Sequence, residues 1–126
     1  MQTHDKYGNQ ELGKKGEELA KNYLIQKGYK FLISNYRYGR VEIDLIFLDV
    51  SRKLIVFVEV KTRRTKTFGE PEQSLTYTKR KNFLKAVNGF LYKNQHYQNY
   101  DVRIDAVTVY FENTDIIYNH IENAFY

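Results

Sequence analysis

The feature that most constrains this chain is the apolar run of residues 54–58, Leu-Ile-Val-Phe-Val, which ends directly on Glu59-Val60-Lys61. A continuous apolar run of this length is typical of a strand that is covered on both faces. Residues i and i+2 of a strand share a face, so Glu59 and Lys61 are expected to point the same way. Burying a carboxylate beside an ammonium is costly. We therefore expect the end of this strand to serve a functional site.

A second apolar run, residues 45–48, follows Glu42-Ile43-Asp44, and the polar segment 49–53 between the runs predicts a hairpin turn. A turn centred near Ser51 places Asp44 roughly opposite Glu59. Like charges in such a cross-strand pair are destabilising, so something must compensate them. A divalent cation is one answer, and with Lys61 beside it the group is suited to phosphodiester hydrolysis. The alternative is that the two acids form separate salt bridges with Lys61 and Arg63.

Composition limits the remaining possibilities. The 126 residues are enough for one domain with one core, so we expect a single domain spanning residues 1–126. The absence of cysteine excludes disulfide bonds and thiolate zinc sites. No apolar run approaches the roughly 18 residues of a membrane span, and the N-terminus has no signal-peptide profile. A cytoplasmic protein without a membrane partner is therefore expected.

The positive charge of the chain is concentrated in one segment. The net charge is +5, yet residues 51–85 alone hold ten lysines and arginines against three glutamates. A basic block that begins beside the carboxylates fits a polyanion such as nucleic acid. The candidate phosphate contacts are Arg63, Arg64, Lys79 and Arg80. The alternative for all four is an ordinary solvated surface.

Hydrophobic periodicity predicts helices over residues 9–27 and 78–94, the second capped by Thr78. Strands are expected over residues 29–36, 40–48, 54–62, 102–111 and 116–118. This order indicates an α/β or α+β fold, a central mixed β-sheet flanked by a helix on each face. Within the first helix, Glu17 lies at the border of the apolar stripe, from where it could reach over the sheet. We further expect Phe31 and Ile33 to share a face, Asp105 to pair with Arg103, and the second helix to bury Phe83, Leu84, Val87, Phe90 and Leu91.

These motifs, in this order of elements, resemble the PD-(D/E)XK nuclease-like superfamily. The segments 16–20, 42–46, 57–63, 68–71 and 121–125 resemble its YraN-type family of small bacterial proteins. Ile43 replaces the proline of the superfamily's name motif, and Val41 stands where the family more often has glycine. The resemblance implies a restriction-endonuclease-like core, close to that of Holliday-junction resolvases.

The same resemblance implies roles for individual residues. Asp44 and Glu59 would bind Mg²⁺ or Mn²⁺ with help from the Val60 carbonyl, and Glu17 would be an outer ligand or a ligand of a second metal. Lys61 would be the catalytic lysine, which orients or activates water.

The expected function is that of a metal-dependent endonuclease acting on branched, nicked or single-stranded nucleic acid, DNA rather than RNA. Many such nucleases pair to address two strands, and by that analogy a homodimer is expected. One alternative is a nucleic-acid-binding module that kept the nuclease scaffold and lost turnover. Another is a protein-interaction domain whose basic face meets an acidic partner.

Overall fold

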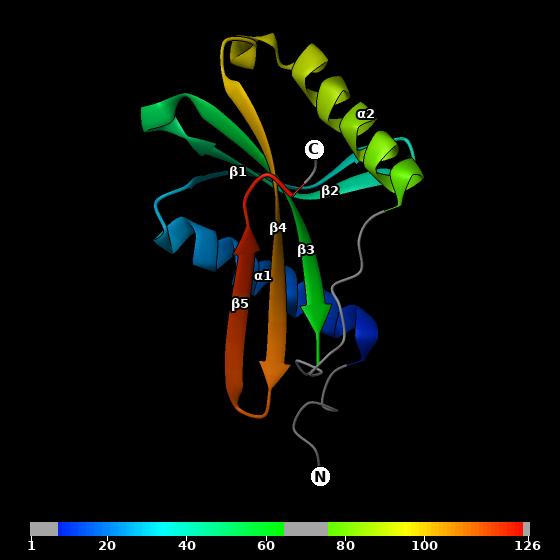
Figure 1. The fold of residues 1–126 in the computed structure, drawn as a ribbon, viewed down its shortest axis with the longest axis vertical. Helices are drawn as coiled ribbons and strands as arrows, with labels where there is room; N and C mark the ends of the chain where they lie inside the picture. The colour runs from blue at the N-terminus through cyan, green and yellow to red at the C-terminus, as the bar shows by residue number, and fades with distance from the viewer. Residues whose placement is uncertain (1–7, 65–75, 125–126) are drawn as a thin grey trace.

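The computed structural model of the chain describes residues 8–64 and 76–124, which form a five-stranded sheet with the order β1-β2-β3-β4-β5 (Figure 1). The β3–β4 pair is parallel and the other three pairs are antiparallel. The expected mixed sheet is therefore confirmed. In chain order the elements are α1 (Asn9–Gln26), β1 (Lys30–Tyr38), β2 (Val41–Asp49), η2 (Val50–Arg52), β3 (Leu54–Arg63), α2 (Tyr77–Lys93), η3 (Gln95–Tyr97), β4 (Asp101–Glu112) and β5 (Asp115–Ile121).

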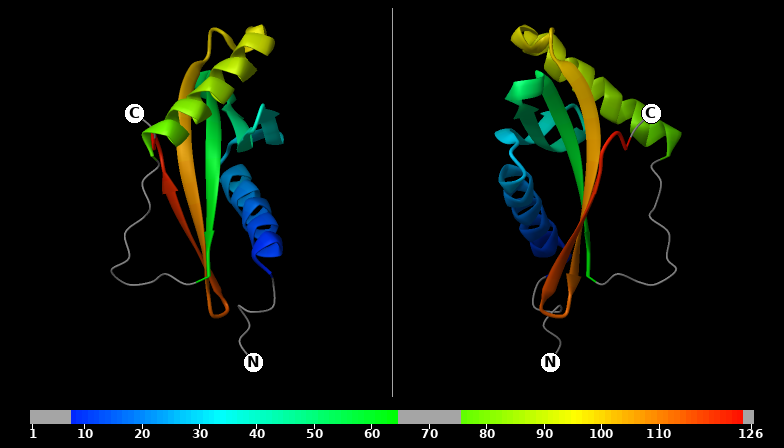
Figure 2. Two further views of the ribbon diagram at one scale, coloured as in Figure 1. Left: turned by 90° about the vertical axis from the view of Figure 1, so that its right-hand side faces the viewer. Right: turned by 60° about the vertical axis from the view of Figure 1, so that its left-hand side comes forward.

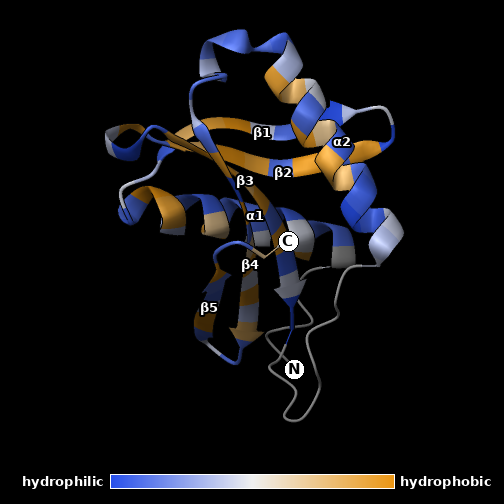
Figure 3. Cartoon of the chain, turned by 45° about the horizontal axis from the view of Figure 1, so that its top comes forward, coloured by the Kyte–Doolittle hydropathy of each residue, from blue (hydrophilic) through white to orange (hydrophobic). Residues whose placement is uncertain are grey.

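The two long helices pack on opposite faces of the sheet, as the sequence predicted (Figure 2). On one face, Ala20 and Leu24 of α1 contact a cluster that includes Phe47. On the other face, Phe83 and Phe90 of α2 contact a second cluster. The side chains of β3 alternate between these two clusters, so its residues 54–58 are all buried. Accordingly, long stretches of β2 and β3 are coloured as apolar, whereas the helices carry both polar and apolar residues (Figure 3).

The expectation that Phe31 and Ile33 share a face is wrong. Phe31 pairs with Phe47 and Ile33 pairs with Ile46, so the register shifts by one residue between them. This β-bulge sends Phe31 to the cluster under α1 and Ile33 to the cluster under α2. One extra residue in a strand reverses which face the following side chains occupy.

The start and the buried stripe of α2 also differ from the prediction. Thr76, not Thr78, caps the helix, and its hydroxyl accepts a hydrogen bond of 3.1 Å from the Lys79 N–H. Leu84 is 43% exposed, and the fully buried Ala86 takes its place in the stripe. The first difference means that the helix begins earlier than expected, and the second reflects which side of α2 packs on the sheet.

The other element boundaries lie close to those expected, except that β5 extends from Asp115 to Ile121 and not only over residues 116–118. The segment 68–71 and Phe125 lie outside the described residues. Within residues 8–64 and 76–124, the structure contains no helix that combines the length and the apolarity of a membrane span.

Helix α1 packs tightly against β3 at Gly16. A Cβ atom built on Gly16 would collide with the Thr62 hydroxyl, so only glycine permits this contact. Thr62 directly follows Lys61 and Glu17 directly follows Gly16. The contact therefore places the backbone of Glu17 beside the end of β3.

Candidate active site

The hairpin of β2 and β3 opens at the two acids that the sequence singled out. Paired residues run from Asp49–Leu54 to Leu45–Val58, and the next position outward in this register is Asp44 opposite Glu59. At that position the Val60 N–H donates a hydrogen bond of 2.7 Å to Asp44 Oδ2. A side-chain carboxylate thus takes the place of a main-chain acceptor where the ladder ends.

The regular alternation of β2 breaks at Asp44. Ile43 packs in the cluster under α2, whereas Leu45, two residues later, packs in the cluster under α1. In an unbroken strand these two side chains would share a face. The break turns the Asp44 carboxylate toward β3, where it meets Val60.

Burial raises the pKa of Asp44 to about 7, although the hydrogen bond from Val60 opposes the change. The nearby carboxylates of Glu17, Glu59 and Glu42 raise it further. Burial also raises the pKa of Glu59, while the charges of Lys61 and Lys79 lower it. Both acids therefore lie where their ionised forms lack full compensation.

Glu59 carries the clearest sign of a missing partner. Its Oε1 atom is buried and has no hydrogen-bond partner among the described residues. Buried polar atoms are nearly always satisfied by protein or ordered water, so each exception needs an explanation. A cation between Asp44 and Glu59 would supply the missing interaction, and the two carboxylates fit that role.

Within residues 8–64 and 76–124, no three histidine, cysteine or acidic side chains form a ready-made ligand group. Mg²⁺ commonly uses one or two carboxylates and keeps several waters, so a pair of acids is a sufficient protein contribution for that ion.

Lys61 lies on the same strand face as Glu59. Phe57, two residues before Glu59, packs under α2, so alternation directs Glu59 and Lys61 to that side. The charge of Lys79, in the first turn of α2, acts on Glu59 from the same side. The two lysines thus approach Glu59 from different elements.

Glu17 is half-buried on α1 and borders two depressions. The larger, of about 450 Å³, is lined by Leu12, Gly13, Glu17, Val60, Lys61, Thr62, Arg63 and Arg64. The smaller, of about 220 Å³, is lined by Lys14, Glu17, Glu18, Lys21, Ser34, Asn35 and Leu45. Glu17, Val60 and Lys61 are therefore gathered around one pocket, and Arg63 and Arg64 extend its wall.

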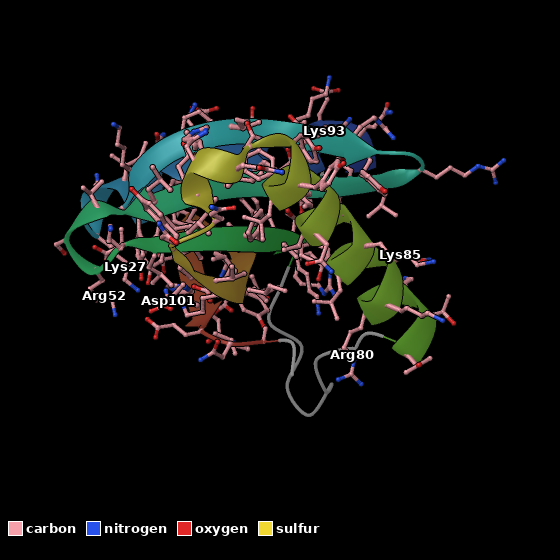
Figure 4. All side chains as sticks on the ribbon, turned by 90° about the horizontal axis from the view of Figure 1, so that it is seen from above. Lys27, Arg52, Arg80, Lys85, Lys93 and Asp101 are labelled. Carbon is pink, nitrogen blue, oxygen red and sulfur yellow. The ribbon has the colours of Figure 1, made fainter. Side chains whose placement is uncertain are left out.

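The predicted phosphate contacts lie near this end of the sheet. Arg63 Nη1 donates a hydrogen bond of 3.0 Å to the Thr62 carbonyl, which fixes its direction along the pocket wall. Arg80 projects from the first turn of α2, whereas Lys27, Arg52 and Asp101 lie at the opposite end of the molecule (Figure 4). The charge of Lys79 thus acts on Glu59, while Arg63 and Arg64 line the pocket that Val60 and Lys61 border.

The sequence did not single out Asn35. Its Nδ2 donates a hydrogen bond of 3.0 Å to Glu17 Oε1. Asn35 lies in β1 with a φ of +54°, a left-handed conformation that is uncommon inside a strand. An asparagine within a half-apolar strand was the only signal available.

A second buried acid, Asp105 of β4, has a full set of partners. Arg103 donates to both of its oxygens at 2.9 Å, which confirms the predicted pair. His120 Nε2 lies 2.8 Å from Oδ2, and the Asn123 N–H donates to Oδ1 at 3.2 Å. Lys27 Nζ lies 2.8 Å from His120 Nδ1. With its proton on Nε2, His120 can donate to the Asp105 carboxylate and accept from Lys27 at the same time.

A hairpin that sets two acids opposite each other beside a lysine, on a mixed sheet between two helices, is the arrangement of the PD-(D/E)XK nuclease-like superfamily. The chain is a nuclease-like protein of that class. More narrowly, it belongs to the uncharacterised protein family UPF0102, the YraN family, whose sequence model matches residues 16–109.

Relatives in this family match most of the chain. The UPF0102 protein of Thermodesulfovibrio yellowstonii is 42% identical over 116 residues, which are 92% of this chain and 96% of that protein. The UPF0102 protein of Clostridioides difficile is 41% identical over 117 residues, covering 93% and 98% of the two chains. The relative from Syntrophomonas wolfei is 44% identical over 119 residues, covering 93% and 99%. None of these names states an activity.

Among solved structures, the SfsA protein of Pyrococcus furiosus, determined in complex with Ca²⁺, matches with a TM-score of 0.44 at 15% identity. The match covers 90% of this chain and 63% of SfsA. A likeness at this level says nothing about activity.

Proposed function

We propose that the protein is a metal-dependent endonuclease that hydrolyses phosphodiesters in structured or single-stranded DNA. The observation that carries the proposal is the incompletely compensated pair of acids at the opening of the hairpin. Asp44 has a pKa raised to about 7, and Glu59 Oε1 is buried without a partner among the described residues. An acid pair that served stability alone would be neutralised by a neighbouring cation, as Asp105 is by Arg103.

Asp44, Glu59 and the Val60 carbonyl would hold Mg²⁺ or Mn²⁺, and Glu17 would act as an outer ligand or as a ligand of a second ion. When bound, the ion supplies Lewis-acid activation of a phosphate oxygen and lowers the pKa of a coordinated water. Lys61 orients the attacking water and stabilises negative charge that develops on the phosphate. A lysine suits this role because it is a compact charge on a flexible stem.

Arg63, Arg64, Lys79 and Arg80 bind the phosphate backbone on both sides of the acids. Such contacts are independent of sequence and weaken as the salt concentration rises. Because phosphate contacts do not read the base sequence, we propose selectivity for DNA structure. Cutting both strands of a branched duplex needs two sites, which a homodimer would provide.

A second candidate function is binding without turnover. A pKa of about 7 leaves much of Asp44 protonated near neutral pH, so the acid pair can be partly neutralised without any metal. A nucleic-acid-binding module could keep the scaffold in that state. It would use the basic residues alone.

One experiment separates the two functions. The purified protein is incubated with labelled Holliday junctions, flaps, single strands and duplex DNA, in Mg²⁺, Mn²⁺ or EDTA. We expect metal-dependent cleavage that falls at least about 100-fold in Asp44→Asn, Glu59→Gln and Lys61→Met, since each removes part of the transition-state stabilisation.

Asp49→Asn is the matched control, because Asp49 lies on the same strand but forms a surface ion pair with Arg52. Cleavage that survives the Asp44 and Glu59 substitutions would identify a contaminating nuclease and contradict the proposal. Binding without cleavage in any metal would establish the second function.

A further inference from the structure

Among the described residues, four that are not glycine have a positive φ: Asn35, Lys53, Asn113 and Asn123. Lys53 ends η2 between β2 and β3, Asn113 lies between β4 and β5, and Asn123 follows β5. Asn35 differs, because it lies inside β1. A left-handed residue costs about 1–2 kcal/mol and is kept where the surroundings require it.

The strained residue lies across from Asp44. Ser34 pairs with Leu45 and Tyr36 pairs with Ile43, which leaves Asn35 opposite Asp44 in the same register. Ile33 and Tyr36, three residues apart, both pack on the side of α2. Regular alternation would have placed Asn35 on the same face as Ile33 and so away from α1.

The backbone turn at Asn35 directs its side chain toward α1 instead. Its amide reaches Glu17 Oε1 at 3.0 Å, and both residues border the smaller depression. Glu17 carries a flexible side chain whose ordering costs up to about 2 kcal/mol. One hydrogen bond to one oxygen restricts that freedom and leaves the other oxygen available to a ligand.

We infer that Asn35 is a positioning residue, which holds the Glu17 carboxylate beside Asp44 for the metal ion. This inference rests on the proposed function, since it assigns Asn35 a part in the same site. Residues that orient metal ligands typically change metal affinity by about 10–100-fold when they are removed. An amide suits the task, because its N–H binds a carboxylate without adding a charge to a site already rich in acids.

Three variants test the inference in the intact chain. Asn35→Gly keeps the left-handed backbone and removes the amide. Asn35→Asp keeps the shape and replaces the N–H donor with a carboxylate oxygen. Because the proposed role depends on the donor, Asn35→Asp should weaken metal binding as Asn35→Gly does. Asn113→Gly is the matched control, because Asn113 has a φ of +56° in the β4–β5 turn, outside both depressions that Glu17 borders.

Mn²⁺ affinity is measured by titration calorimetry and by electron paramagnetic resonance, without nucleic acid. We expect about 10-fold weaker binding in Asn35→Gly, at the lower end of the range for such residues. Binding in Asn113→Gly should equal that of the wild type, and in the Glu17→Gln background Asn35→Gly should cause no further loss. The inference would be overturned if Asn35→Gly bound Mn²⁺ as tightly as the wild type. It would also be overturned if the losses of affinity in Asn35→Gly and Glu17→Gln added in the double variant.

A second measurement keeps the inference testable if the wild type binds no Mn²⁺, a result that would contradict the proposed function. In the metal-free protein, the Asn35 side-chain amide is followed by ¹H–¹⁵N NMR. Its resonance should shift, and its proton exchange should accelerate, in Glu17→Gln but not in Glu18→Gln, since Glu18 is exposed on the next position of α1. An Asn35 amide that does not respond to Glu17→Gln would show that no such bond orients Glu17.

Discussion

Two buried acidic centres lie on neighbouring strands and are compensated in opposite ways. Asp105 of β4 pairs with Val58 of β3, and the next residue of β3 is Glu59. The acids are thus close in the sheet, but one centre is saturated with donors and the other is not. The comparison indicates which centre holds the fold together and which is available for a ligand.

The saturated centre behaves as part of the core. Burial alone would raise the pKa of Asp105, but hydrogen bonds from His120 and Arg103 outweigh burial and lower it. Arg103 also donates a hydrogen bond of 2.7 Å to the Tyr29 hydroxyl. These contacts join β4 and β5 to the segment that leads into β1, with both charges neutralised.

The other centre has the same residue type and too few partners. Asp44 receives one hydrogen bond from Val60, while Glu59 Oε1 receives none from the described residues. Burial raises the pKa of both. A strongly perturbed acid beside a pocket is a candidate functional group, whereas a fully satisfied one is ordinarily structural.

The largest predicted effect is the loss of stability in Asp105→Asn. The substitution keeps the shape and removes the buried counter-charge of Arg103, leaving only the exposed Glu122 carboxylate 3.5 Å from Arg103 Nη1. Breaking a buried ion pair in this way typically costs about 3–5 kcal/mol. The free energy of unfolding is measured in urea, with the exposed Asp101→Asn as control. A loss below about 1 kcal/mol would mean that the Asp105 centre is not structural.

Asp44→Asn should change the free energy of unfolding in the opposite direction, toward greater stability. The folded pKa of about 7 exceeds the ordinary value of 3.8, so the folded state holds a proton that the unfolded state releases. The contribution of Asp44 to wild-type stability should therefore be greatest below about pH 4 and fall as the pH rises to about 7.

The uncharged amide of the Asp44→Asn variant would remove this pH dependence, and the variant should be more stable than the wild type at pH 8. We expect a gain of about 2 kcal/mol, since each unit of pKa difference corresponds to about 1.4 kcal/mol and Asp44 is only half-buried. Urea unfolding at pH 4 and pH 8 measures the effect, with Asp49→Asn as control. A variant that is less stable at pH 8 would contradict the assigned direction.

A smaller effect should distinguish the centres by their response to Mn²⁺. At ten times the dissociation constant, a bound ion adds about 1.4 kcal/mol to stability. The melting temperature of the wild type should rise by several degrees. The rise should persist in His120→Gln, which alters the Asp105 centre, and disappear in Asp44→Asn and Glu59→Gln. If the rise in melting temperature disappeared only in His120→Gln, the ion would bind at the Asp105 centre and not at Asp44 and Glu59.

The smallest effect concerns the outer edge of the saturated centre. Lys27 is exposed, lies 2.8 Å from His120 Nδ1 and is 5.1 Å from the centre of the Tyr23 ring. Lys27→Met should cost no more than about 1 kcal/mol, because an exposed contact of this kind contributes little. Urea unfolding would show whether the loss is larger, which would make Lys27 an integral member of the centre.

Much of the fold could be predicted because local patterns and global packing agree. The apolar run of residues 54–58 predicted a strand covered on both faces. A turn near Ser51 predicted Asp44 opposite Glu59, and this is the position directly beyond the last observed pair, Leu45 with Val58. The helical stripe of α1 likewise identified Glu17 as a border residue. The roles assigned to these acids and to Lys61 stay predictions.

The remaining features depend on backbone detail that residue patterns do not encode. The bulge between Phe31 and Ile33 and the left-handed Asn35 each reverse the facing of a strand, and neither changes its composition. Thr76 and Thr78 have the same N-cap propensity, so the sequence alone does not tell them apart. The structure shows that Thr76 is the cap. The hydrogen bond between Asn35 and Glu17 was missed because it depends on the left-handed backbone of Asn35, which the sequence pattern does not reveal.

The contact of Gly16 with Thr62 has a consequence for how this scaffold could change. Because glycine has no side chain, the backbone of α1 can lie directly against Thr62, and this contact sets the distance between Glu17 and the hairpin. Alanine at position 16 would push the helix away from the strand. The Glu17 carboxylate would then lie farther from the hairpin, although no acidic residue had been replaced. Since a displacement of about 1 Å can reduce a reaction rate about 100-fold, a single methyl group could tune this site without altering any residue that touches a substrate.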